Sequence, residues 1–169
     1  MKLSMFFILL FLLSACTSKE CTTNKYPYDG NYQYSASVVY NYMDYYLKGD
    51  ALINSINKNN GMLSISTLNE DNTSNASFFS MIMLDKHYAI ATFNTDNQTS
   101  INLKIKPQAM ITYVEYKKDE HNILDYIGAR IIIDALIYED DILKFQTDYG
   151  VSIKDNQFVF KIREIRPLG

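Results

Sequence analysis

The chain has 169 residues, of which 47% are hydrophobic, 21% are charged and three are prolines. This composition is typical of a folded globular protein and excludes a largely disordered chain. The formal net charge of −3 offers no basic surface to a polyanion, so we expect no nucleic acid among the partners.

The first 15 residues have the pattern of an export signal. Lys2 supplies a positive charge, and residues 3–13 are apolar except for Ser4. This stretch is shorter than the roughly 20 residues that span a bilayer as a helix, so it predicts a secretory signal. Leu-Ser-Ala-Cys at 13–16 resembles the lipobox of bacterial lipoproteins, in which the cysteine is acylated and the peptide before it is removed. The resemblance implies lipid attachment at Cys16; the alternative is an ordinary signal peptide cleaved at the same small residues.

We therefore expect a signal peptide at 1–15, a lipidated tether at 16–36 and a folded domain at 37–169. The tether is predicted because residues 17–36 lack an apolar period and contain Pro27 and Gly30. More than one acyl chain makes membrane attachment stable. The expected location is the bacterial cell envelope, with the chain lipid-anchored to a membrane and its domain outside the cytoplasm.

Two short helices are predicted at the start of the domain. The first shows apolar residues at intervals of three to four, namely Val38, Val39, Tyr42, Met43, Tyr46 and Leu47. The second is expected to have Asp50 as its N-cap, Leu52, Ile53 and Ile56 on its inward face, and the Asn-Asn-Gly of 59–61 as its stop. We expect these helices to cover one side or end of a β-barrel.

Six strands are predicted from runs of β-branched and aromatic residues between turn-forming residues, at 61–67, 76–84, 87–93, 109–116, 126–139 and 158–169. A short helical turn is expected before the fourth strand. In the fifth strand, alternation places one set of residues on the core face: Ile127, Ala129, Ile131, Ile133, Ala135 and Ile137. Arg130 and Asp134 share the other face, which suggests an ion pair or an interface. Closing the strands into a small barrel would remove exposed sheet edges.

The sequence shows no recognisable catalytic constellation, so the catalytic residues are unknown. His87 and His121 have no ligand spacing to a cysteine, and no zinc site is predicted. The acidic residues at 139–141 are interpreted as the start of a helix at 141–147 rather than as a metal site. Nucleophile-elbow, P-loop and dinucleotide-binding motifs are missing. An enzymatic role would depend on a bound cofactor, and whether the protein is an enzyme stays open.

The ordered set of segments resembles the FMN-binding split barrel of the pyridoxamine 5'-phosphate oxidase-like family, over residues 47–169. The most specific matches are Asn102-Leu103 and Lys106-Pro107, where the family tends to show Asn-Leu and Asn-Pro, and the Arg-Pro-Leu-Gly ending at 166–169. The resemblance implies a mainly β fold, a six-stranded antiparallel split β-barrel with a few flanking short helices. It also implies a homodimer with FMN at its interface.

The resemblance further implies which residues would contact the flavin, with the backbone of 76–84 beside its ring: Thr92, Asn94, Asn97, Thr99 and Ser100. Gln98 and Thr99 stand where the family commonly has an Arg-Lys pair, and Asp96 adds a negative charge. Hydroxyls and N–H groups at a helix start can still bind phosphate. Each missing charge-assisted bond would cost roughly 1.5 to 3 kcal/mol.

The leading functional hypothesis is a membrane-anchored lipoprotein whose FMN-binding domain acts as an oxidoreductase on a small molecule. The alternative is a non-enzymatic lipoprotein that kept the barrel and binds another ligand, such as heme, or serves as a surface interaction module. The missing basic pair favours this alternative. A different small β-barrel is a third hypothesis. Introducing a lysine at Thr99 is the substitution that the sequence suggests for separating the first two.

Overall fold

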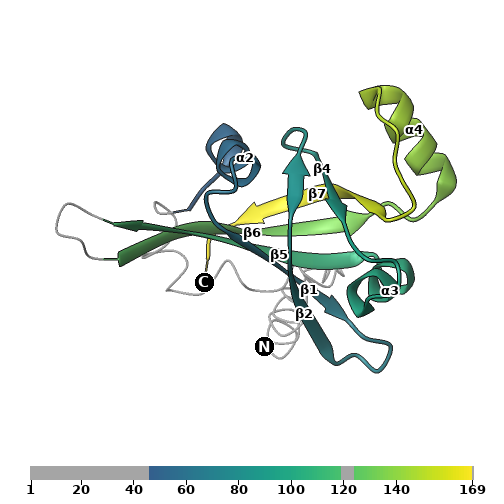
Figure 1. Ribbon diagram of the computed structural model, residues 1–169, viewed down its shortest axis with the longest axis horizontal. Helices are drawn as coiled ribbons and strands as arrows, with labels where there is room; N and C mark the ends of the chain where they lie inside the picture. Colours follow the sequence, from purple (N-terminus) through teal and green to yellow (C-terminus); the bar gives the residue numbers. More distant parts are fainter. Residues whose placement is uncertain (1–45, 119–123, 169) are drawn as a thin grey trace, which may run out of the picture. The chain divides into compact units, whose positions relative to one another are not determined.

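The computed structural model describes residues 46–118 and 124–168 (Figure 1). The chain divides into units Met1–Gly30 and Asn31–Gly169, and all described residues belong to the second. The predicted signal, Cys16, the tether and most of the first predicted helix lie outside the described residues. The described elements are α2 (Gly49–Asn57), β1 (Met62–Leu68), β2 (Ser74–Phe79), β3 (Met81–Met83), β4 (Tyr88–Thr92), α3 (Gln98–Ile105), β5 (Gln108–Lys118), β6 (Leu124–Ala135), α4 (Glu139–Tyr149) and β7 (Gln157–Arg166).

The seven strands form one sheet in the order β2-β1-β5-β6-β7-β4-β3, and neighbouring strands are antiparallel. β2 and β3 lie at opposite ends of this order, yet only Ser80 separates them in the chain. The sheet must therefore curl until its two edges are joined by continuous backbone. The fold class is confirmed as a mainly β, antiparallel split barrel. The predicted segment 76–84 breaks at Ser80, so the strands number seven rather than six.

The core fills the inside of the curled sheet. On β6, Ala129, Ile131 and Ile133 are completely buried, which confirms the core face predicted for this strand. Aromatic side chains fill the part near the Ser80 bend: Phe79 stacks on Phe93 at a centroid distance of 5.3 Å and meets Phe160 edge-on at 6.4 Å. Such pairs stabilise beyond the area that they bury.

Helix α2 packs through Leu52 and Ile56, as predicted, but its N-cap is Lys48 and not Asp50. Asp50 lies in the first turn, where its carboxylate interacts favourably with the helix dipole. At the other end of α2, the Asn57 side chain donates to Met83 O and accepts from Met83 N–H, both at 2.8 Å. These bonds occupy backbone groups of the edge strand β3, which would otherwise be available to another chain.

Helix α4 begins with Glu139, Asp140 and Asp141 in its first turn and ends at Gly150 with a φ of 63°. The acidic start was predicted, and the left-handed glycine is a common helix stop. Within residues 46–118 and 124–168, no group of three or more His, Cys, Asp or Glu side chains is placed to hold a metal. In the same residues, no helix is long and apolar enough to cross a membrane.

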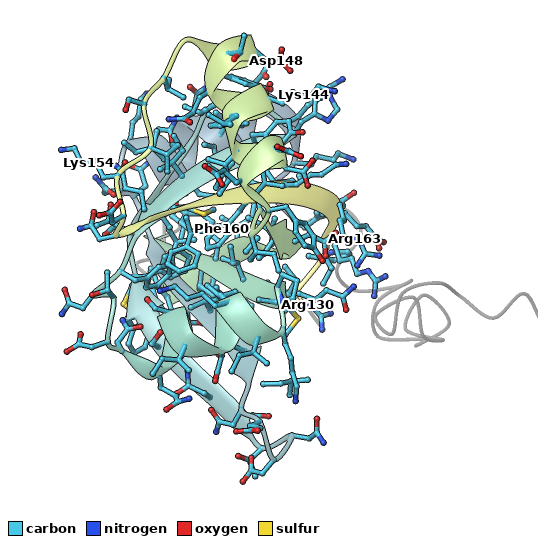
Figure 2. The ribbon with its side chains drawn as sticks, turned by 90° about the vertical axis from the view of Figure 1, so that its right-hand side faces the viewer. Arg130, Lys144, Asp148, Lys154, Phe160 and Arg163 are labelled. Carbon is cyan, nitrogen blue, oxygen red and sulfur yellow. The ribbon has the colours of Figure 1, made fainter. Side chains whose placement is uncertain are left out.

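The outer face of β6 and β7 carries charged side chains, with Arg130 and Arg163 projecting to the same side (Figure 2). Asp134 Oδ2 lies 3.5 Å from Arg163 Nε, whereas Arg130 Nε donates to the carbonyl of Pro167 at 2.9 Å. The suggested Arg130–Asp134 pair is thus replaced by a contact with β7. The pairing of β6 with β7 shifts register between Ile132 and Ile133, which brings Arg163 into this position.

Candidate functional site

The junction between β4 and α3 gathers the residues predicted to contact a cofactor. Asn97 is the N-cap of α3, and its side chain accepts the Ser100 N–H at 2.7 Å. The Ser100 hydroxyl donates to the carbonyl of Asn94, also at 2.7 Å. Thr92 and Asn94 are exposed. The structure therefore brings the five predicted residues together in one tight junction.

The Thr99 and Ser100 hydroxyls point into the protein. Thr99 is only 2% exposed, and its Oγ1 lies 2.8 Å from Ser77 Oγ and 3.1 Å from Asn75 Nδ2 on β2. Ser100 is completely buried. Both hydroxyls already have hydrogen-bond partners within the chain: Thr99 fixes α3 to β2, and Ser100 fixes the helix start to Asn94 in the loop after β4.

Asn102, part of the Asn-Leu motif, is the centre of this polar network. It is 1% exposed, and its Nδ2 donates to Thr67 Oγ1 at 3.0 Å and to Asn69 Oδ1 at 2.8 Å. Its Oδ1 accepts from Gln98 Nε2 at 2.8 Å. Lys106 Nζ donates to the carbonyl of Asn69 at 2.8 Å. The side of α3 that faces β1 and β2 is thus held by hydrogen bonds rather than by apolar packing alone.

Sequence reasoning missed the partners that β1 and β2 contribute to this network. Thr67 lies on the same face of β1 as buried Leu63 and Ile65, and Asn75 and Ser77 alternate with exposed residues along β2. A polar residue in an inward-facing row is a detectable signal, because a buried polar group requires a partner. The identity of that partner was not detectable, since Asn102 is 35 residues from Thr67.

The start of α3 retains two backbone donors. Ser100 and Ile101 give their N–H groups to Asn97, while those of Gln98 and Thr99 have no hydrogen-bond partner among the described residues. A helix N-terminus also carries a partial positive charge of about 0.5. Lys106 is bonded to the β1–β2 turn, and Asp96 is exposed nearby in the chain. A phosphate therefore fits this end through neutral donors and the helix dipole, with no cation among residues 92–100.

A cavity of about 220 Å³ lies further along β2, lined by Ile56, Asn59, Gly61, Met62, Leu63, Phe78, Phe79, Ser80 and Tyr113. The completely buried Tyr113 has its hydroxyl 2.6 Å from Ser55 Oγ, and Ser55 in turn donates to Glu115. Burial raises the pKa of Tyr113 against the lowering effect of the Ser55 bond, so the phenol stays neutral. Phe79 is four residues from Asn75, about 13 Å along an extended strand. One strand thus connects the α3 network to an apolar cavity.

Neither a family model nor a curated protein matches the chain. Among solved structures, it is similar to HupZ of Group A Streptococcus, at 22% identity and a TM-score of 0.49, covering 72% of this chain and 94% of that one. An FMN-binding protein from Syntrophomonas wolfei has 20% identity, a TM-score of 0.47 and coverage of 70% and 84%. A heme-binding protein from Mycobacterium smegmatis has 18% identity, a TM-score of 0.46 and coverage of 68% and 51%.

Proposed function

We propose that the domain binds FMN, with the phosphate at the N-terminus of α3 and the ring beside the backbone of 76–84. The observation that carries this proposal is the pair of available N–H donors on Gln98 and Thr99, held in place by the buried network. Bound flavin would supply redox chemistry toward a small-molecule substrate, as an FMN-dependent oxidoreductase requires. The protein supplies the donors and the rigid strand beside them.

The predicted contact residues take different roles in this proposal. Exposed Thr92 and Asn94 offer side-chain donors to the ligand. Asn97 and Ser100 shape the helix start, and Thr99 contributes its backbone N–H while its hydroxyl holds β2. Because every donor is neutral, we expect a lower affinity for the phosphate group than at a site with arginine or lysine.

We also propose that the domain is a homodimer. Met62 is 54% exposed and Phe78 is 76% exposed, and both border the cavity beside β2. Large apolar side chains gathered at an exposed site support a protein partner. A second copy of the chain that covers them would also exclude water from a flavin ring bound beside β2.

Flavin binding is tested by the absorption spectrum of the purified full chain after incubation with FMN and removal of free ligand. We expect retained flavin, and an approximately tenfold gain in FMN affinity for Gln98→Lys, because one charge-assisted bond is worth about 1.5 kcal/mol or more. Gln98 is exposed, whereas a lysine at buried Thr99 would break the network. Riboflavin, which lacks the phosphate, should show no such gain. Thr147→Lys, at an exposed position on α4, is the control for the added positive charge and should leave FMN affinity unchanged.

The flavin proposal is wrong if neither the parent chain nor Gln98→Lys retains FMN while both keep a folded circular-dichroism spectrum. A heme band that is retained when the chain is incubated with heme instead of FMN would support the second function, binding of another ligand. The inward direction of the Thr99 and Ser100 hydroxyls is the observation that favours this second function.

We further propose that the protein is a lipoprotein anchored at Cys16 to the cell envelope. The support is the sequence of residues 1–16, with its apolar run and small residues before the cysteine. Bacteria that express the chain and are fed labelled palmitate should produce a labelled protein. Cys16→Ser should abolish the label and Cys21→Ser should keep it. Label that follows Cys21, or that survives Cys16→Ser, would contradict the anchor.

A further inference from the structure

Helix α4 is fastened to the sheet mainly through one aromatic cluster, made of Tyr88 on β4 and Phe145 and Tyr149 on α4. The Tyr88 ring lies 5.2 Å from Phe145 and 5.3 Å from Tyr149, and Phe145 and Tyr149 stack at 4.8 Å. In Figure 1, α4 stands at the edge of the described fold, beyond the end of β6. Phe145 is the one buried residue of α4, so the helix packs against the sheet mainly through this ring.

The last turn of α4 is held by a hydrogen bond to the β3–β4 turn. Tyr149 OH donates to Asp85 Oδ2 at 2.6 Å, and Asp85 Oδ1 accepts the N–H groups of His87 and Tyr88. This bond raises the pKa of Tyr149 to about 12. Burial works to raise the pKa of Asp85, but the three donors outweigh it and lower that pKa. The two groups stay in their bonding forms at neutral pH, and the helix position is defined.

Between α4 and the sheet lies a cavity of about 360 Å³, within the range of small-ligand pockets. Four aromatic side chains contribute to its wall: Tyr88, Tyr138, Phe145 and Tyr149. The remaining lining residues are Pro107, Asp134, Ala135, Leu136, Ile137, Asp141, Lys144, Asp148 and Lys161. None of them belongs to the β4–α3 junction, so this is a separate site from the proposed flavin site.

The charges on this wall favour a cation. Three aspartates face two lysines, and Lys144 and Asp148 both lie on α4 (Figure 2). The exposed lysines carry their ammonium groups on four-carbon stems that can turn to solvent, whereas an aspartate on its short stem keeps its charge at the wall. A cation that enters would therefore meet carboxylates at close range, while the lysines move aside.

Asp134 is the least exposed of the three carboxylates that line the cavity. Its Oδ1 is buried and has no hydrogen-bond partner among the described residues, and its Oδ2 has only the 3.5 Å contact to Arg163. The side chain is still 29% exposed and lines the cavity. A positive group placed beside it would offset the cost of this partly buried charge.

We propose that the cavity binds a small organic amine with an aromatic or apolar body. The ammonium group lies near Asp134, and the body packs on the exposed ring of Tyr138. Aromatic faces attract both apolar groups and cations, so the rings and the carboxylates select the same class of ligand.

The test is calorimetric titration of the full chain with tyramine and with 4-hydroxyphenylacetate, which share a ring and differ in charge. Tyramine should bind at least about tenfold more tightly than 4-hydroxyphenylacetate, because only the amine can form an ion pair with Asp134. Asp134→Asn should weaken tyramine binding about tenfold, and Tyr138→Ala, at a 69% exposed position, about fivefold. Asp155→Asn on the exposed α4–β7 loop is the control and should change nothing.

Equal affinities for the two probes would overturn the proposal, as would tyramine binding that survives both Asp134→Asn and Tyr138→Ala. The Tyr138 variant keeps the test valid if Asp134→Asn perturbs folding through Arg163. Because the site does not share residues with the β4–α3 junction, tyramine binding is expected with or without flavin. If one of the two proposals, the flavin site or the amine site, is contradicted, the other can still be tested.

Discussion

Gly128→Ala is expected to remove about 3 kcal/mol or more of folding stability, the upper part of the range for overpacked cores. A Cβ at Gly128 would lie 2.0 Å from the Tyr113 carbonyl oxygen and 2.8 Å from Leu168 Cδ1. The first neighbour is backbone of the interior strand β5, which is paired on both sides and cannot yield easily. Tyr113 is completely buried and its hydroxyl is bonded to Ser55, so shifting β5 would disturb the core and α2 together.

The measurement is chemical denaturation of the parent chain and of Gly128→Ala, with each free energy of unfolding extrapolated to water. Gly150→Ala is the matched control. A Cβ there meets nothing within 4 Å, but the φ of 63° makes alanine cost about 1 kcal/mol. The steric prediction requires Gly128→Ala to be clearly the more damaging change. Similar losses at both positions would show that the sheet accommodates the extra methyl.

Asn102→Leu is expected to cost about 3 kcal/mol, although leucine has nearly the size of asparagine. The change removes the bonds to Thr67, Asn69 and Gln98, and Thr67 is buried. Thr67 Oγ1 keeps the bond from Asn75 Nδ2 at 3.2 Å but loses the shorter one, so part of its desolvation cost is left without compensation. Since the same bonds hold α3 on β1, the variant should also lose whatever affinity the α3 N-terminus gives to FMN.

Thermal and chemical denaturation of Asn102→Leu measure this cost, with Gln98→Ala as the comparison. Gln98 is exposed and shares one of the three bonds, so its loss should stay below about 1 kcal/mol. If Asn102→Leu is as mild as Gln98→Ala, the network contributes little and apolar packing of Leu103 holds the helix. Leu103 is completely buried, which makes that comparison informative.

Local patterns were enough to predict the strands, their core face on β6, the inward residues of α2 and the acidic start of α4. These features depend on residues that are near one another in the chain, where alternation and helical spacing act directly. The Asn-Leu motif was also found, but as a resemblance and without its physical role. Its role in the structure is to bond α3 to β1.

The amino-acid sequence by itself determined the fold class, whereas the N-terminal signal and the phosphate-binding segment stay predictions. The tertiary structure decided the break at Ser80, the replacement of Arg130 by Arg163 beside Asp134, and the inward direction of Thr99 and Ser100. It also decided the cavity under α4, whose walls come from β4, β6, β7 and the helix. Apart from the Ser100 hydroxyl, whose acceptor Asn94 is close in the chain, these features depend on contacts between residues distant in the chain. Hydroxyl and carboxylate side chains can satisfy a neighbour or a ligand equally well, and only packing determines which of the two they face.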